Sequence, residues 1–212
     1  MQWTLVVPLK PLPQAKSRLA DTADDGLRPG LALAFAQDTV AAALGCPAVR
    51  DVVVVTNDAL AARELAALGA GTVPDLPRAG LNAALAHAAT VVGAARRAAS
   101  VAALNADLPA LRPSELARVL DAAAEFPRSF LADSAGLGTT LLAASRGREL
   151  RPQFGVGSRA RHRASGAVEL TLDGVDSVRQ DVDTGGDLRA ALALGVGPRT
   201  AAAAARLPAG QQ

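Results

Sequence analysis

The sequence is poor in cysteine and in aromatic residues, and both shortages exclude whole classes of protein. Its 212 residues include one cysteine, Cys46, so neither an internal disulfide nor a cysteine-based zinc cluster can form. Aromatic side chains make up only 2% of the chain and tyrosine is absent, which leaves few platforms for stacking nucleic-acid bases. We therefore expect a core of Val, Leu and Ala, with Cys46 as a small buried residue.

The chain also lacks a strong charge excess and long apolar runs. It has 22 basic and 20 acidic residues, and the resulting net charge of +2 does not suggest a nucleic-acid-binding surface. We find no uninterrupted run of about 18 apolar residues, so no transmembrane helix is expected. No basic segment precedes the apolar run MQWTLVV, which is unlike a secretory signal peptide. These absences predict a cytoplasmic protein with no nucleic-acid partner and no membrane partner.

Short β-branched segments alternate along the chain with longer segments rich in Ala and Leu. Strands are expected at residues 3–9, 51–56, 71–74, 101–104, 129–132 and 140–144. Helices are expected at residues 31–44, 60–68, 81–95, 113–125 and 187–194. Apolar strands without strict alternation indicate burial on both faces, and the helices between them indicate parallel crossovers. The pattern predicts an α/β, three-layer Rossmann-like fold with a mostly parallel central sheet.

We expect one domain over residues 1–199, followed by a low-complexity C-terminal tail over residues 200–212 that frays or docks loosely. Within that domain, polar and charged side chains follow several strands, at the edge where open parallel sheets bind ligands. The proline-rich loop VVPLKPLPQAKSRLA after the first strand contains Lys10, Lys16 and Arg18. It is either a solvated surface loop or an anion clamp, in which the lysines act as point charges and Arg18 as a planar fork.

Carboxylates occur in two further segments that are distant from each other in the sequence. Asp107 lies in NADLP after a buried strand, and Asp181 and Asp183 lie in the later segment QDVDTGGDL. Residues i and i+2 of an extended segment point the same way, so Asp181 and Asp183 can face one site. Mg²⁺ favours one or two carboxylates together with water and substrate phosphates. The alternative is turn and capping chemistry, which we expect for Asp187 as the partner of Thr184 in a capping box.

The remaining motifs are weaker. The segment GVGSRA at residues 155–160 fits the pattern GxGxxA but follows no clear strand, so a dinucleotide-binding Rossmann protein is not expected. Its glycines do allow backbone N–H groups to approach an anion. His87 and His162 have no partners that suggest a hydrolase triad. His162, in RARHR, is expected either at the solvated surface, which we favour, or at the rim of an anionic-substrate pocket. Neither a Walker A loop nor a GxSxG elbow occurs.

Five segments occur in an order that resembles the molybdenum-cofactor guanylyltransferase-like nucleotidyltransferases: PLKPLPQAKSRLA, VVVVTND, GLNAALAHA, NADLPAL and QDVDTGGDL. More narrowly, KSRLA, GTT, FGVGSRARHRASGA and DVDT resemble the 2-phospho-L-lactate guanylyltransferase family, whose members make the activated intermediate from which coenzyme F-420 is built. The resemblance covers about residues 3–195. The first loop departs from the wider superfamily, because it has PLK where glycines are usual.

This resemblance implies an Mg²⁺-dependent enzyme that moves GMP from GTP to the phosphate of an acceptor. The acceptor is phosphoenolpyruvate or 2-phospho-L-lactate, and we favour phosphoenolpyruvate because similar bacterial members are associated with it. The implied site residues are Lys10, Lys16 and Arg18 for the triphosphate; Asn57, Gly80 and Asn82 for the base and ribose; Thr139, Thr140, Gly155 and Ser158 for the acceptor; and Asp107, Asp181 and Asp183 for the metal. The alternatives are another acceptor, or a GTP-binding regulatory module without turnover.

Overall fold

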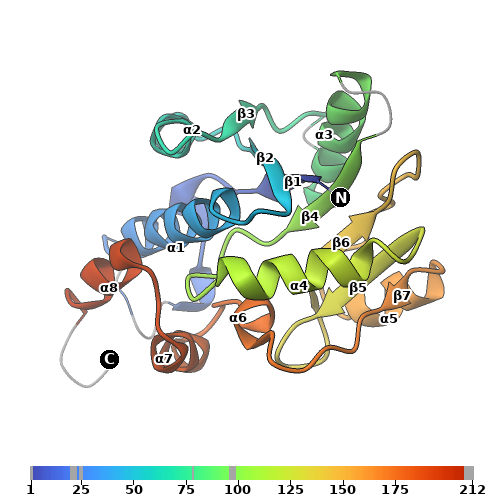
Figure 1. The fold of residues 1–212 in the computed structure, drawn as a ribbon. Helices are drawn as coiled ribbons and strands as arrows, with labels where there is room; N and C mark the ends of the chain where they lie inside the picture. Colours follow the sequence, from blue (N-terminus) through green and yellow to red (C-terminus); the bar gives the residue numbers. More distant parts are fainter. Residues whose placement is uncertain (1, 20–22, 24–25, 78, 96–98, 208–212) are drawn as a thin grey trace.

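The computed structural model describes residues 2–19, 23, 26–77, 79–95 and 99–207, and within them seven strands form one sheet (Figure 1). The strands are β1 (Trp3–Pro8), β2 (Val49–Val55), β3 (Gly71–Val73), β4 (Ser100–Leu104), β5 (Arg128–Ala132), β6 (Thr139–Ala144) and β7 (Val168–Glu169). Their order across the sheet is β3-β2-β1-β4-β6-β5-β7. Only β6 runs antiparallel to its neighbours, so the mostly parallel sheet predicted from the sequence is confirmed.

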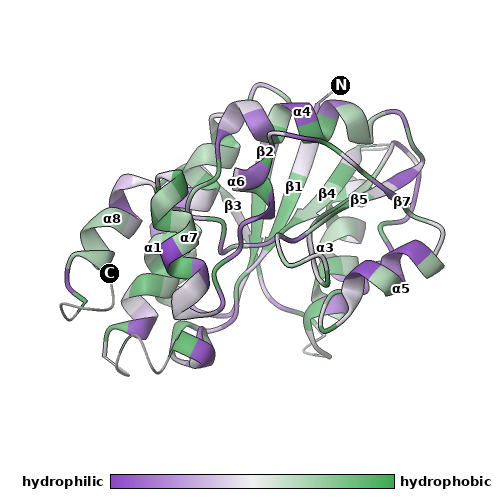
Figure 2. Ribbon diagram, turned by 90° about the horizontal axis from the view of Figure 1, so that it is seen from below, coloured by the Kyte–Doolittle hydropathy of each residue, from purple (hydrophilic) through white to green (hydrophobic). Residues whose placement is uncertain are grey.

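Helices cover both faces of this sheet. They are α1 (Arg28–Leu44), α2 (Ala59–Ala66), α3 (Leu81–Ala95), α4 (Pro113–Ala123), α5 (Ser158–Ala164), α6 (Asp176–Arg179), α7 (Gly185–Leu194) and α8 (Pro198–Ala204), with short 3-10 turns at η1 (Leu12–Gln14) and η2 (Ser17–Leu19). The helices α1 and α4 pack on one face and α3 packs on the other, which gives three layers (Figures 1 and 2). In the part of the chain that the structure describes, no helix is long and apolar enough to span a membrane.

Alternate residues of the central strands enter two different hydrophobic clusters. Leu5 and Val7 of β1 pack with residues of α1 and α4, whereas Val6 between them packs with residues of α3. All three side chains have no exposed surface. Burial of such a side chain contributes roughly 1.5–3 kcal/mol to folding. Because both faces of the central strands are buried, their sequences are continuous apolar runs. Cys46 lies buried in the first of these clusters, as expected.

The strands β5 and β6 are joined by a loop rather than by a crossover helix. Residues 133–138 are too few for a parallel crossover, so the chain turns back and β6 pairs antiparallel to β5 and β4. As a result, the beginning of β6 lies at the edge where the parallel strands have their carboxyl ends. Thr139, the first residue of β6, therefore reaches the ligand-binding edge of the sheet.

The C-terminal segment contains a packed helix. The helix α8 packs against α1, and Thr200 is fully buried. The division into a domain over residues 1–199 and a tail over residues 200–212 stays a prediction. The carboxylate of Asp38, on α1, accepts a hydrogen bond of 2.7 Å from the backbone N–H of Thr200. Pro198 in the first turn and the following alanines also favour a helix. Residues 208–212 of the predicted tail lie outside the described residues.

Candidate active site

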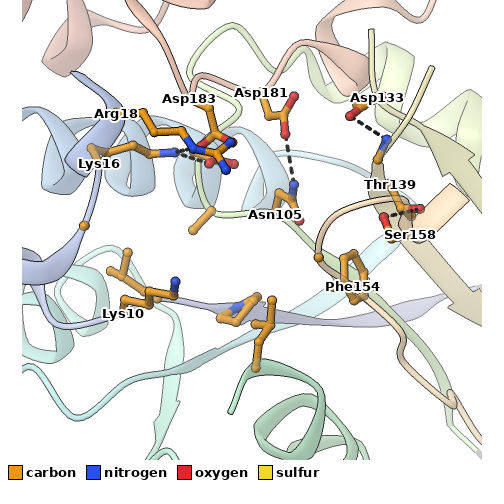
Figure 3. Close-up of a pocket in the computed structure, with 18 of the residues that line it drawn as sticks. Lys10, Lys16, Arg18, Asn105, Asp133, Thr139, Phe154, Ser158, Asp181 and Asp183 are labelled. Carbon is orange, nitrogen blue, oxygen red and sulfur yellow. Dashed lines mark hydrogen bonds and ion pairs between the residues drawn. The ribbon is translucent and has the colours of Figure 1, made fainter. Parts of the chain in front are cut away.

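A cavity of about 950 Å³ lies at the carboxyl ends of β1 and β4 (Figure 3). Its wall is formed by the loops that follow these strands, by residues 133–138 and by the segments that precede α5 and α7. Ten of the residues predicted for the site line it: Lys10, Lys16, Arg18, Gly80, Asp107, Thr139, Gly155, Ser158, Asp181 and Asp183. Residues from distant parts of the chain thus meet around one space.

Lys16 is the centre of an ion-pair cluster on one side of the cavity. Its Nζ atom donates to Oδ2 of Asp107 and lies 3.1 Å from Oδ1 of Asp183, and Arg18 lies 3.7 Å from the other Asp183 oxygen. The Lys16 side chain is only 10% exposed. Burial opposes its charge, but the Asp107 and Asp183 carboxylates outweigh burial and raise the pKa of Lys16. The backbone of Lys16 has a φ of +59°, a left-handed conformation that non-glycine residues adopt at a cost of order 1 kcal/mol or more.

Asp181 lies beside this cluster in a crowded negative environment. Burial, followed by the charges of Asp107, Asp183 and Asp133, raises the pKa of Asp181 to about 7. Its Oδ2 atom accepts a hydrogen bond of 3.4 Å from Nδ2 of Asn105. Nothing in the described part of the chain hydrogen-bonds to the buried Oδ1 atom of Asp107. Crowded carboxylates with an unsatisfied oxygen fit a bound cation.

The carboxylates do not form a complete metal cage. Among the described residues, no group of three or more Asp, Glu, His or Cys side chains is arranged to hold a metal ion. This arrangement still fits Mg²⁺, which usually keeps several waters and binds through one or two carboxylates and substrate phosphates. The position of Lys16 between Asp107 and Asp183 means that a protein cation already balances part of their charge.

Hydroxyl groups form the opposite side of the cavity (Figure 3). Ser158 Oγ donates to Oγ1 of Thr139 at 3.2 Å, and both side chains are buried against the wall. Gly155, with a φ of +115°, places backbone next to them in a conformation that favours glycine. Thr139, Gly155 and Ser158 therefore lie together, as predicted for one subsite.

His162 is fully buried behind these hydroxyl groups and does not line the cavity, so both expected positions, at the surface and at a pocket rim, are wrong. Its ring packs against Phe130 and Phe154, with ring centroids 5.7 Å and 5.1 Å away. Burial, together with the charges of Arg128 and Arg161, lowers the pKa of His162 to about 4. The sequence suggested a surface position because arginines flank this histidine, but the aromatic residues that cover it come from β5 and from the segment before α5.

Three predicted site residues do not line the cavity. Asn57 and Asn82 clamp loops instead: Asn57 exchanges hydrogen bonds with the backbone of Asp75, and Asn82 with the backbone of Phe154. Asp75 and Phe154 do line the cavity, so the two asparagines support its wall. Thr140 is fully buried, and no hydrogen-bond partner for its hydroxyl occurs among the described residues.

Asp133 lines the cavity although sequence reasoning did not select it. Its carboxylate accepts hydrogen bonds from the backbone N–H groups of Leu137 and Gly138, at 2.9 Å and 2.8 Å. A Cβ atom on Gly138 would lie 2.3 Å from Oδ2 of Asp133, so this close approach requires glycine. The available signal was an aspartate directly after a strand, followed by two glycines.

Asp187 forms the capping box with Thr184 that the sequence predicted.

Comparison with known proteins agrees with this geometry. Residues 3–202 match the sequence profile of the family described as "Guanylyl transferase CofC like". The chain belongs to this family. A protein of Streptomyces coelicolor named phosphoenolpyruvate guanylyltransferase is 79% identical to the CofC-like chain over 207 residues, which are 98% of each protein. The family resemblance drawn from the sequence motifs is thus confirmed.

Solved structures share the fold of the CofC-like chain. A nucleotidyl transferase from Methanothermobacter has a TM-score of 0.63 at 20% identity, covering 91% of this chain and 97% of that one. The Mycobacterium tuberculosis protein Rv0371c, in complex with manganese, has a TM-score of 0.55 at 23% identity, covering 91% and 99%. These likenesses confirm the Rossmann-like nucleotidyltransferase fold.

Proposed function

We propose that this chain transfers GMP from GTP to the phosphate of phosphoenolpyruvate, giving enolpyruvyl-diphosphoguanosine and pyrophosphate in the assembly of coenzyme F-420. The observation that carries the proposal is the two-sided cavity, with lysine, arginine and carboxylate groups on one side and hydroxyl groups on the other (Figure 3). The name of the 79% identical Streptomyces coelicolor relative supports this acceptor. Since both substrates are cytoplasmic metabolites, we expect the activity in the cytoplasm.

The cationic side suits the triphosphate. Lys10 and Arg18 are exposed at the rim, and Lys16 lies deeper between its two carboxylates. Lysine and arginine bind phosphate through charge-assisted hydrogen bonds, and they neutralise the negative charge that pyrophosphate carries as it leaves. A separate part of the wall is assigned to the base and ribose: Gly80 lines the cavity there, and Asn57 and Asn82 hold neighbouring loops of the wall.

The carboxylate side suits a divalent cation. Asp107, Asp181 and Asp183 would hold Mg²⁺, and the manganese complex of the structurally similar Rv0371c supports divalent-metal use. When bound, the ion supplies Lewis-acid polarisation of the phosphates and charge neutralisation. Lys16, which lies between Asp107 and Asp183, would share these carboxylates with the ion and would offer its ammonium group to phosphate oxygens.

The hydroxyl side suits the acceptor. The hydroxyl of Thr139 and the backbone at Gly155 can hydrogen-bond to an anionic phosphate or carboxylate. Ser158 holds the Thr139 hydroxyl by donating to it, and the buried Thr140 follows Thr139 in β6. A phosphate oxygen of the acceptor attacks the α-phosphorus of GTP, and the bond to the β-phosphate oxygen breaks as pyrophosphate leaves in line. Because that nucleophile is already ionised at neutral pH, the reaction requires no general base, which agrees with the buried position of His162.

The test measures pyrophosphate release with Mg²⁺, each of the four nucleoside triphosphates, and either phosphoenolpyruvate or 2-phospho-L-lactate. We expect release with GTP and phosphoenolpyruvate, while preferential use of 2-phospho-L-lactate would change the acceptor. No release with any combination rules out the enzyme proposal. Asp107→Asn separates a catalyst from a GTP-binding module: a catalyst loses turnover by about 100-fold or more, whereas a module only needs to retain GTP binding. Asp173→Asn, an exposed loop carboxylate, is the control.

A further inference from the structure

His162 is connected by hydrogen bonds to the hydroxyl side of the cavity. The backbone N–H of Gln153 donates to its Nε2 atom at 2.9 Å, and its Nδ1 atom lies 2.9 Å from Oγ1 of Thr139. Ser158 donates to the same Thr139 oxygen. Thr139 and Ser158 line the cavity but His162 does not, so its influence on a ligand must pass through these hydroxyl groups (Figure 3).

The contact with Gln153 decides which nitrogen of the His162 ring carries the proton. A backbone N–H can only donate, so Nε2 must accept and is unprotonated. In the neutral ring the proton is then on Nδ1, which donates to Thr139. A charged ring would place a second N–H against that of Gln153, and burial with Arg128 and Arg161 nearby also keeps the ring neutral.

The proton on Nδ1 in turn fixes the direction of the Thr139 hydroxyl. A hydroxyl oxygen has two lone pairs and one proton. Both lone pairs of Thr139 Oγ1 are used, one by His162 and one by Ser158. Its proton is therefore available to the cavity that the side chain lines. With the proton of the ring on Nε2 instead, Thr139 would donate to His162 and present only lone pairs to an anion.

The surroundings hold this arrangement in place. Phe130 and Phe154 fix the plane of the imidazole ring, at interplanar angles of 42° and 76°. Asn82 accepts from the backbone N–H of Phe154 at 2.7 Å and donates to its carbonyl oxygen at 3.1 Å. This clamp fixes the segment that supplies the Gln153 N–H.

We propose that His162 is a positioning residue of the acceptor site: as the neutral ring protonated on Nδ1, it turns the Thr139 hydroxyl proton into the cavity, where that proton is donated to an anionic oxygen of the acceptor. The proposal rests on the proposed function, which supplies the anionic acceptor. A phosphate and a carboxylate oxygen offer the same acceptor chemistry to this hydroxyl.

The protonation of the ring can be measured on the unaltered chain. The sequence has two histidines, so ¹⁵N-histidine labelling gives two imidazole rings, and His87→Gln assigns them. At neutral pH we expect His162 to show an unprotonated Nε2 and a protonated Nδ1. The opposite pattern, or a doubly protonated ring, overturns the proposal. Because no substrate is present, this result does not depend on the proposed function.

Steady-state kinetics then tests the consequence for the acceptor. His162→Leu should raise KM for phosphoenolpyruvate by about 10-fold or more and leave KM for GTP within about 2-fold, because a hydrogen bond to an ionised group is lost. His162→Asn keeps an N–H donor near the position of Nδ1 and should restore most of the affinity. In a Thr139→Val background, neither change should have a further effect.

Two kinetic results contradict the proposal: equal changes in both KM values, or a full His162→Leu effect in the Thr139→Val background. Either would mean that His162 acts only through stability. Should His162→Leu fail to fold because the Gln153 N–H loses its acceptor, the NMR measurement decides. If the unaltered chain uses no acceptor at all, the proposed function fails, while the NMR result still tells how His162 directs Thr139.

Discussion

Asp181→Asn should make the metal-free protein more stable and, at the same time, inactive. Asp181 is partly buried near Asp107, Asp183 and Asp133, and burial and these charges raise its pKa from 3.8 to about 7. In the unfolded chain its pKa returns to the ordinary value. Above neutral pH, folding therefore moves a charged carboxylate into an unfavourable place. An asparagine of nearly the same shape removes this penalty but cannot bind a cation as a carboxylate does.

Proton linkage gives the size of the effect. The difference between 3.8 and about 7 corresponds to about 4 kcal/mol for a side chain fully shielded from water. Solvent reaches the wall of the cavity and screens the charges, so we expect about 1–2 kcal/mol. That corresponds to a Tm increase of about 3–6 °C for a chain of this length.

The sign of the pH dependence follows from the same shift. Between about pH 4 and pH 7 the folded state binds more protons than the unfolded state, so this carboxyl makes stability fall as pH rises through that window. Asp181→Asn lacks this fall, and its gain should be present at about pH 8 and absent at about pH 4. Thermal unfolding in EDTA at each of these two pH values measures the stability gain and its absence, with Asp173→Asn as the control. A variant less stable than the unaltered chain at the higher pH refutes the reasoning and makes Asp181 a structural group.

Three further changes test other parts of the account. Lys16→Gln should lower turnover by about 100-fold or more, while Arg50→Gln, exposed at the opposite edge of the sheet, should leave it unchanged in the pyrophosphate assay. Gly138→Ala should raise KM for the acceptor, measured by steady-state kinetics, because its Cβ would lie 2.3 Å from Oδ2 of Asp133 and the loop must shift. Asp38→Ala should cost about 1–3 kcal/mol in urea unfolding without loss of turnover, because the first N–H groups of α8 lose a buried acceptor.

Helices and strands were predicted well where the apolar pattern of the segment matches its burial in the folded protein. The helix α3 has the bounds expected from its apolar pattern, and β1 differs from its prediction only at its end. The short elements α6, α8 and β7 were not predicted. They depend on contacts between distant segments, such as the ion pair of Arg159 with Glu169 and the hydrogen bond from Thr200 to Asp38.

The candidate site was predicted where a general rule applies to it. Groups that follow parallel strands collect at one edge, and this rule predicted that Lys16, after β1, and Asp107, after β4, would share one cavity. It could not tell that Thr139 lines the cavity whereas Thr140 does not, because a strand's register decides which neighbouring residue faces a site. Nor could it find Asp133, whose position depends on the return of the chain from β5 to β6.

The central claim is that one cavity brings the α-phosphorus of GTP to a phosphate oxygen of the acceptor. The most direct test uses phosphoenolpyruvate labelled with ¹⁸O in its phosphate, together with unlabelled GTP and Mg²⁺, and follows the products by ³¹P NMR and mass spectrometry. We expect a new diphosphate whose bridging oxygen carries the label, with unlabelled pyrophosphate released in equal amount. Label in the pyrophosphate, or pyrophosphate release without the labelled diphosphate, would contradict the claim.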